Sequence, residues 1–127
     1  MKKAYLLPIF VLLSILTISL WNCSVISKES RRWQSQLQEV TTLAQSGNWA
    51  TVSAALETSY ADWTSHQSWL HIVAQHNVID DAEAMYHRAM AFAATQEPSE
   101  FQAEISDLLT QLRLLAEMER FSIQNIL

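Results

Sequence analysis

Residues 97–115, EPSEFQAEISDLLTQLRLL, decide the fold class of this chain. Large apolar side chains recur within it at steps of four, three, four and three residues, at Phe101, Ile105, Leu108, Leu112 and Leu115. This spacing places all five on one face of an α-helix. Pro98 and the acidic residues around it are typical of a helix start, because the first turn tolerates proline and favours carboxylates. We therefore predict an amphipathic helix that begins near Pro98.

The chain before this segment carries the same pattern twice. Two apolar stripes at helical spacing consist of Trp33, Leu37, Val40 and Ala44, and then of Trp49, Val52, Leu56, Tyr60 and Trp63. Between them, Gly47 is expected to end one helix with a positive φ, and Asn48 to cap the next. We expect Trp49 to be a buried core residue.

A third helical stretch is predicted from Ser65 to Thr95, with a bend near Asn77. Its apolar positions are Trp69, Ile72 and Val73 in the early part, and Ile79, Ala82, Tyr86, Ala89, Met90 and Ala93 in the later part. The chain has one Gly, two Pro and no alternation of the β type, so strands are not expected. Because short connections make consecutive helices antiparallel neighbours, the sequence predicts an all-α protein with an up-and-down bundle of three to four helices. The apolar tail from Phe121 to Leu127 is expected to fold back on this bundle.

Ahead of the bundle, residues 4–27 (AYLLPIFVLLSILTISLWNCSVIS) contain no charged side chain. A helix of this length reaches roughly 36 Å, which is enough to cross a hydrocarbon core of about 30 Å. Tyr5 and Trp21 lie near its two ends, where aromatic rings favour the membrane interface. We predict an N-terminal transmembrane helix, with a single-pass membrane anchor at residues 1–27 and a helical bundle domain at residues 28–127.

The alternative for the first 27 residues is a cleaved signal peptide, with Lys2 and Lys3 as its basic start. The cleavage signals are weak, because Trp21 and Asn22 stand where a lipoprotein signal before Cys23 needs small residues. We therefore expect a retained anchor in the cell membrane. Basic residues flank both sides of the apolar run, so charge does not choose its orientation. Since a short tail before a first apolar segment commonly stays cytoplasmic, the bundle is expected outside the cytoplasm.

Charge and composition exclude several functions. Beyond the anchor, six Lys and Arg stand against 13 Asp and Glu, a net charge of −7. Phosphate backbones need clustered basic side chains, so no nucleic-acid binding is expected. Cys23, the sole cysteine, lies at the edge of the apolar segment and is a poor candidate nucleophile. With one Gly and no Gly-x-Ser-x-Gly motif, the chain offers neither a phosphate-binding loop nor a nucleophile elbow. We expect no catalytic residues, no cofactor and no enzyme activity.

One polar group has geometric support as a site, and it consists of His76, Asp80, Glu83 and His87. Steps of four, three and four residues place them within roughly 60° of arc on one helix face, where neighbouring members could bind a metal ion. The apolar stripe lies beside this face, so we favour a structural role and expect a bond between His76 and Asp80. His66 and His71 are expected to stay apart from it, because steps of five residues turn each ring by about 140°.

The segments above also resemble a known family. The resemblance lies in the N-terminal anchor, Gly47-Asn48-Trp49, Trp63, the stretch from His76 to Asp80, and the ending Asn125-Ile126-Leu127. The family is domain of unknown function 4363, small membrane-anchored proteins found mainly in Gram-positive bacteria. Where that family usually ends in Asn-Ile-Phe, this chain has Leu127, which is also apolar. The resemblance implies a bacterial, membrane-anchored helical protein with its domain outside the cytoplasm, and it implies no activity.

We therefore expect a non-enzymatic, membrane-tethered interaction or scaffold protein with an unidentified protein partner. The trait that favours this function is an acidic helical bundle attached to a membrane. The alternative is a protein that binds a metal or small ligand through the helix face of His76, Asp80, Glu83 and His87. Thermal stabilisation by divalent ions, lost in His76→Ala, would distinguish the two.

Overall fold

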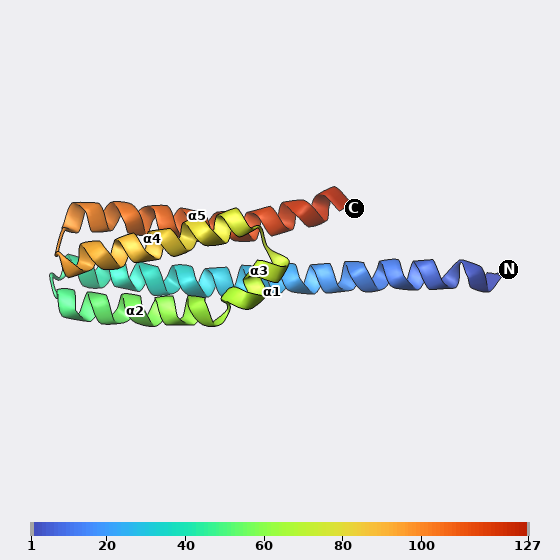
Figure 1. Ribbon diagram of the computed structural model, residues 1–127, viewed down its shortest axis with the longest axis horizontal. Helices are drawn as coiled ribbons and strands as arrows, with labels where there is room; N and C mark the ends of the chain where they lie inside the picture. Colours follow the sequence, from blue (N-terminus) through green and yellow to red (C-terminus); the bar gives the residue numbers. More distant parts are fainter. Residues whose placement is uncertain (1, 127) are drawn as a thin grey trace.

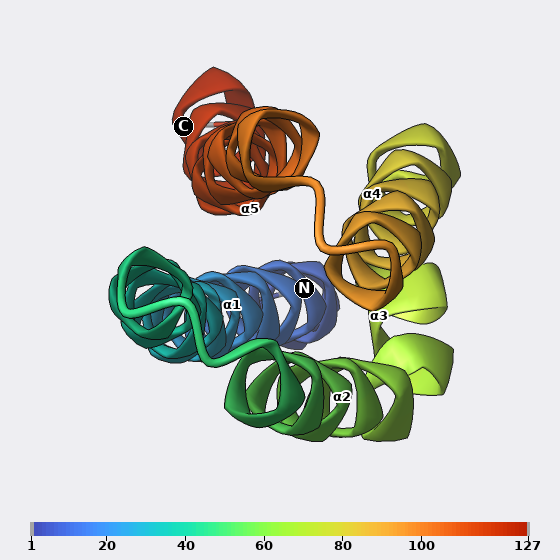
Figure 2. The same ribbon diagram turned by 90° about the vertical axis from the view of Figure 1, so that its left-hand side faces the viewer.

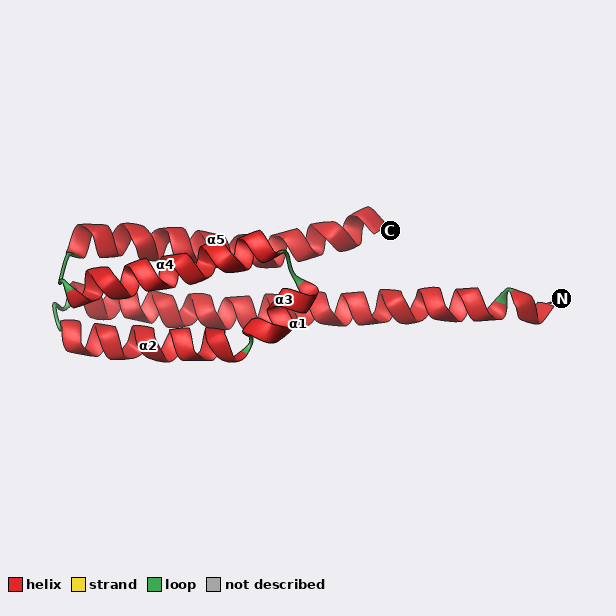
Figure 3. Cartoon of the chain, in the orientation of Figure 1, coloured by secondary structure: helices red, strands yellow, loops and turns green. Residues whose placement is uncertain are grey.

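The computed structural model describes the backbone of residues 2–126, and the side chains of these residues apart from 2, 73, 119 and 122–126. A short 3-10 helix, η1 (Lys2–Ala4), precedes the α-helices α1 (Leu6–Gln45), α2 (Trp49–Ser65), α3 (Gln67–Val73), α4 (His76–Ala94) and α5 (Pro98–Ile126). Within this range the chain contains no strand (Figure 3). The predicted all-α class is confirmed.

Four of the helices form a bundle, seen end-on in Figure 2. α1 packs against α2 and α5, and α4 packs against the same two helices, so α1 and α4 lie on a diagonal. The chain direction alternates from one long helix to the next (Figure 1), which confirms the up-and-down arrangement. The short α3 lies at one end of the bundle and joins α2 to α4.

α1 runs without interruption for 40 residues. Its apolar beginning projects beyond the bundle (Figure 1), and fully buried side chains start at Ile26. Among the described residues it is the one helix that is long and apolar enough to cross a membrane, a property that a signal sequence shares. The apolar segment and the first bundle helix are therefore one structural element.

The predicted stripes supply most of the core. The stripes of α4 and α5 are buried as predicted, apart from the half-buried Met90, and so are most members of the first two stripes. Trp49 is an exception, since it is only half-buried, and the expectation that it lies in the core was wrong. It opens the first turn of α2 at an end of the bundle, where it packs edge-on against Phe101 with 5.4 Å between ring centroids.

The stretch from Ser65 to Thr95 is not one bent helix. It is broken at Ala74 and Gln75, whose backbones are extended, with φ, ψ of −125°, 170° and −73°, 131°. The predicted bend near Asn77 was therefore misplaced. Because α3 follows an axis of its own, its buried face differs from the prediction: Leu70 is buried, whereas Ile72 is 82% exposed.

The chain ends beyond the bundle core. α5 continues as a helix to Ile126, and Phe121 on it is exposed, so Phe121 does not fold back as predicted. The rest of the predicted fold-back concerns the side chains of residues 122–126 and Leu127, which lie outside the described part.

The predicted connection between α1 and α2 is confirmed. Gly47 has a φ of 79°, and the Asn48 side chain accepts a hydrogen bond from the Thr51 amide at 3.4 Å.

Candidate functional site

The four predicted site residues of α4 do not converge on one point. Glu83 and His87 meet Tyr60 of α2, whose hydroxyl donates to Glu83 Oε1 at 3.1 Å and lies 3.1 Å from His87 Nε2. Because the hydroxyl has a single hydrogen, the imidazole must be the donor in its contact with Tyr60. Gln67 of α3 donates to the second oxygen of Glu83 at 2.9 Å. This carboxylate therefore links three helices.

His76 pairs with His71 instead of Asp80. The two Nδ1 atoms lie 2.9 Å apart and the rings stack with centroids 5.0 Å apart. One Nδ1 must donate and the other accept, so the bond is lost when both rings are cationic. The expectation that His71 stays apart was wrong because it assumed one continuous helix, whereas the break at Ala74 brings α3 beside the start of α4. Asp80 is exposed, and the described contacts include no bond between it and His76.

These positions decide what the residues can bind. Among the side chains that the structure describes, no group of three or more His, Cys, Asp or Glu could hold a metal ion. The candidates instead form two separate pairs, His71 with His76 and Glu83 with His87. Structural zinc sites need four protein ligands, and catalytic ones keep three. The four predicted residues do not supply such a set.

A polar connection that the sequence analysis missed runs across α1, α2 and α4, from the buried Ser59 and Tyr86 to the exposed Arg32. We call it the polar seam, and it consists of Arg32, Gln36, Ser59, Asp62 and Tyr86. Ser59 is 1% exposed, donates to Gln36 Oε1 at 2.9 Å and lies 2.9 Å from the Tyr86 hydroxyl, which must then be the donor. Gln36 donates to Asp62 at 3.0 Å, and Arg32 forms an ion pair with the same carboxylate at 2.7 Å.

The chemistry of the polar seam is structural. Each of its groups is used in a bond to another group, as buried polar groups require. The Ser59 hydroxyl contacts a phenol and an amide, not a base that could activate it as a nucleophile. One signal in the sequence could have found it: Ser59 stands between Leu56 and Trp63 on the apolar stripe of α2, where a hydroxyl needs a buried partner.

The two tyrosines of these networks give a prediction about alkaline pH. Burial raises the pKa of Tyr86 well above its ordinary value, although the bond to Ser59 opposes this, and burial also raises the pKa of Tyr60. A phenol whose pKa is higher in the folded state stabilises the fold below pH of about 10, and this stability is lost as the pH rises further.

We therefore expect the tyrosinate absorbance of Tyr86 to appear late, together with unfolding, in an alkaline titration of the intact protein. In Tyr86→Phe, which cannot ionise at this position, stability should fall less steeply above pH of about 10. Ionisation of all three tyrosines near pH 10 in a protein that keeps its helical circular dichroism would contradict the burial of Tyr86.

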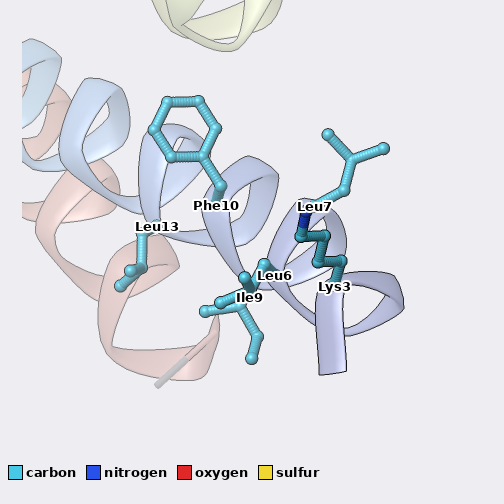
Figure 4. Close-up of a pocket in the computed structure, with 6 residues that line it drawn as sticks. All are labelled: Lys3, Leu6, Leu7, Ile9, Phe10 and Leu13. Carbon is cyan, nitrogen blue, oxygen red and sulfur yellow. The ribbon is translucent and has the colours of Figure 1, made fainter. Parts of the chain in front are cut away.

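One concave surface of the described chain lies at its apolar beginning, away from these networks. It is lined by Lys3, Leu6, Leu7, Ile9, Phe10 and Leu13 (Figure 4). All of these side chains come from the first 13 residues, so a single segment builds the surface. Small-molecule sites are clefts or cavities that bury most of the ligand and place a few polar groups on it. A row of apolar side chains along one projecting helix lacks that form.

Comparisons with known proteins give one match. The family described as Domain of unknown function (DUF4363) matches residues 20–126. This range includes the whole bundle and the last part of the apolar segment. No curated protein and no solved structure matches.

Proposed function

The chain belongs to the DUF4363 family, whose description names no activity, and we propose that it is a membrane-tethered, non-enzymatic protein whose bundle binds another protein. The observation that carries the tether is the continuity of α1. Its apolar segment enters the bundle without a linker, and Ile26, at the boundary, is completely buried. A signal peptide cleaved near Ser27 would remove part of the core, so continuity favours a retained anchor.

The charge distribution supports a protein partner on the half of the bundle away from the anchor. Exposed carboxylates gather there, at Glu39, Glu57, Glu97 and Glu100. Among the described residues Arg88 is the one Lys or Arg in that half, and its guanidinium pairs with Glu104 at 3.0 Å. Such a surface attracts a partner with a basic face. The short tail before the anchor, with Lys2 and Lys3, favours a bundle outside the cytoplasm.

Membrane fractionation tests the anchor. We expect the full chain to stay with membranes in high salt and at alkaline pH, and its mature form to retain the apolar segment. In Leu12→Arg/Leu13→Arg, each charge at the centre of the span costs about 2.5–3.5 kcal/mol, so the protein should be lost from the membrane fraction. Gln38→Arg/Glu39→Arg, on an exposed part of the same helix, should fractionate like the wild type. A soluble mature protein that begins near Lys28 would refute the anchor.

Crosslinking in the native membrane tests the binding role. We expect a specific partner with a basic surface to be captured by a photoreactive group at Gln102, an exposed residue of α5 near the acidic end. Glu97→Lys/Glu100→Lys should weaken the capture several-fold, because it reverses the charge of that end. A single charge reversal at the other end of the bundle, Arg113→Glu, should not weaken the capture. Unchanged capture in the Glu97/Glu100 variant would contradict a charge-directed interface.

A further inference from the structure

The large apolar side chains that the bundle exposes are confined to one of its ends. Outside α1 and the residues before it, the large hydrophobic residues that the described structure exposes are Leu114 (39%), Phe121 (62%) and Ile72 (82%). Ile72 lies on α3 and the other two lie on the second half of α5. Gln75, Leu114, Glu117, Met118 and Phe121 line a shallow concavity there. Contact between these apolar side chains and water is unfavourable in proportion to their exposed area. We therefore expect another surface to cover this end of the bundle.

This end is also the one from which the apolar segment of α1 projects. The Ser30 hydroxyl donates to the Leu112 carbonyl and so fixes the height of α5 along the antiparallel α1. Phe121 is nine residues beyond Leu112, and Trp21 is nine residues before Ser30. Since both helices rise by about 1.5 Å per residue, Phe121 and Trp21 lie at about the same height. Figure 1 shows α3 at this end of the bundle too.

The charged residues of the bundle are also distributed unevenly between its two ends. Five of the six basic residues that follow the anchor lie on the half nearer to the apolar segment, at Lys28, Arg31, Arg32, Arg113 and Arg120. The acids in that half include Glu29 and Asp62, which are paired with Arg32, and also the exposed Asp80, Asp81 and Glu117. The exposed carboxylates Glu97 and Glu100 lie at the opposite end. A membrane surface with anionic lipids therefore repels the second end more strongly than the first.

We propose that the end of the bundle formed by α3 and by residues 112–121 of α5 is inserted into the lipid interface of the membrane that α1 crosses. This inference rests on the proposed anchor. Trp21 and Phe121 then lie at headgroup depth, where aromatic rings are favoured. Leu114, about two helical turns farther from the bilayer centre than Phe121, and Ile72 are covered by the outer part of the same interface. The long side chains of Arg113 and Arg120 reach headgroup phosphates while their stems stay in apolar surroundings. The bundle is thereby docked upright on the bilayer, with its acidic end farthest from it.

Depth-dependent fluorescence quenching tests the docking. In a Cys23→Ser background, single substitutions Phe121→Cys, Ile72→Cys and Gln102→Cys carry an environment-sensitive fluorophore. The full-length proteins are placed in vesicles of phosphatidylcholine and phosphatidylglycerol, with or without lipids that carry a quencher on the headgroup. Gln102 is the matched control, because it is exposed on the same helix roughly 28 Å from Phe121.

We expect a blue shift and loss of emission with quencher lipids for the labels at positions 121 and 72, and neither change for the label at 102. Vesicle flotation is measured on the same samples. Flotation without quenching at 121 and 72 would overturn the docking and leave the anchor intact, whereas loss of flotation would overturn both. A blue shift at 121 that is insensitive to quencher lipids would assign this end to protein contact and would also overturn the docking.

Discussion

Replacing Trp63 with alanine is expected to lower the free energy of unfolding by roughly 3–5 kcal/mol, the usual cost of removing a buried indole. The ring is completely buried. It lies edge-on to Trp33 of α1, with ring centroids 5.0 Å apart, and is tilted against Tyr86 of α4 at 5.9 Å. Trp63 therefore joins three of the four bundle helices. Because a domain of this size has a total stability of about 5–15 kcal/mol, the loss is a large share of it.

Urea unfolding of the detergent-solubilised chain, followed by far-ultraviolet circular dichroism, measures this loss. Trp21→Ala is the matched control, because the same residue type is 68% exposed on the projecting part of α1. Its effect in detergent should stay within about 0.5 kcal/mol. Similar stabilities for the two variants would show that Trp63 does not hold the helices together.

The periodic parts of this fold could be predicted from the sequence. The stripe that begins at Phe101 and ends at Leu115 is buried throughout because α5 is an uninterrupted amphipathic helix that packs against a single core. Gly47 and Asn48 carry strong conformational signals, a positive φ and a helix cap, and both are present. In these places local propensity and tertiary packing favour the same structure, which is why the prediction succeeds.

The break between α3 and α4 could not be predicted in the same way. Ala74 and Gln75 are ordinary helix formers, with no Gly or Pro beside them, yet both adopt extended conformations. Burial of Leu70 on one side and of Ile79 on the other, in helices with different axes, accounts for the break. Tertiary packing overrides propensity here, and Ile72 becomes exposed as a result.

The four candidate site residues do not form one site, and the reason is related. Spacing along one helix placed His76, Asp80, Glu83 and His87 on a common face, but it contained no information about the partners on other helices. Tyr60 on α2 is hydrogen-bonded to Glu83 and His87, and His71 on α3 is hydrogen-bonded to His76 across the break. Long-range contacts of this kind, like those of Ser59 in the polar seam, are set by how the helices pack and not by spacing within one of them.

A shortened chain that begins at Lys28 is expected to be less stable than one that begins at Trp21 by roughly 2–5 kcal/mol. The shorter chain lacks Ile26, which is completely buried, and Ser27, which is 8% exposed. It also begins a helix beside the core, so that amides formerly bonded within α1 lose their partners. Both losses arise because the apolar segment and the first bundle helix are one element.

Urea unfolding of the two shortened proteins gives the difference, and Ile26→Ala in the longer one identifies its source. This variant keeps the backbone of α1 and removes only the buried side chain, so it should reproduce most of the loss. If the chain from Lys28 proved as stable as the chain from Trp21, the bundle would be independent of the segment before it. Cleavage near Ser27 would then cost the fold nothing, and the structural argument for a retained anchor would fail.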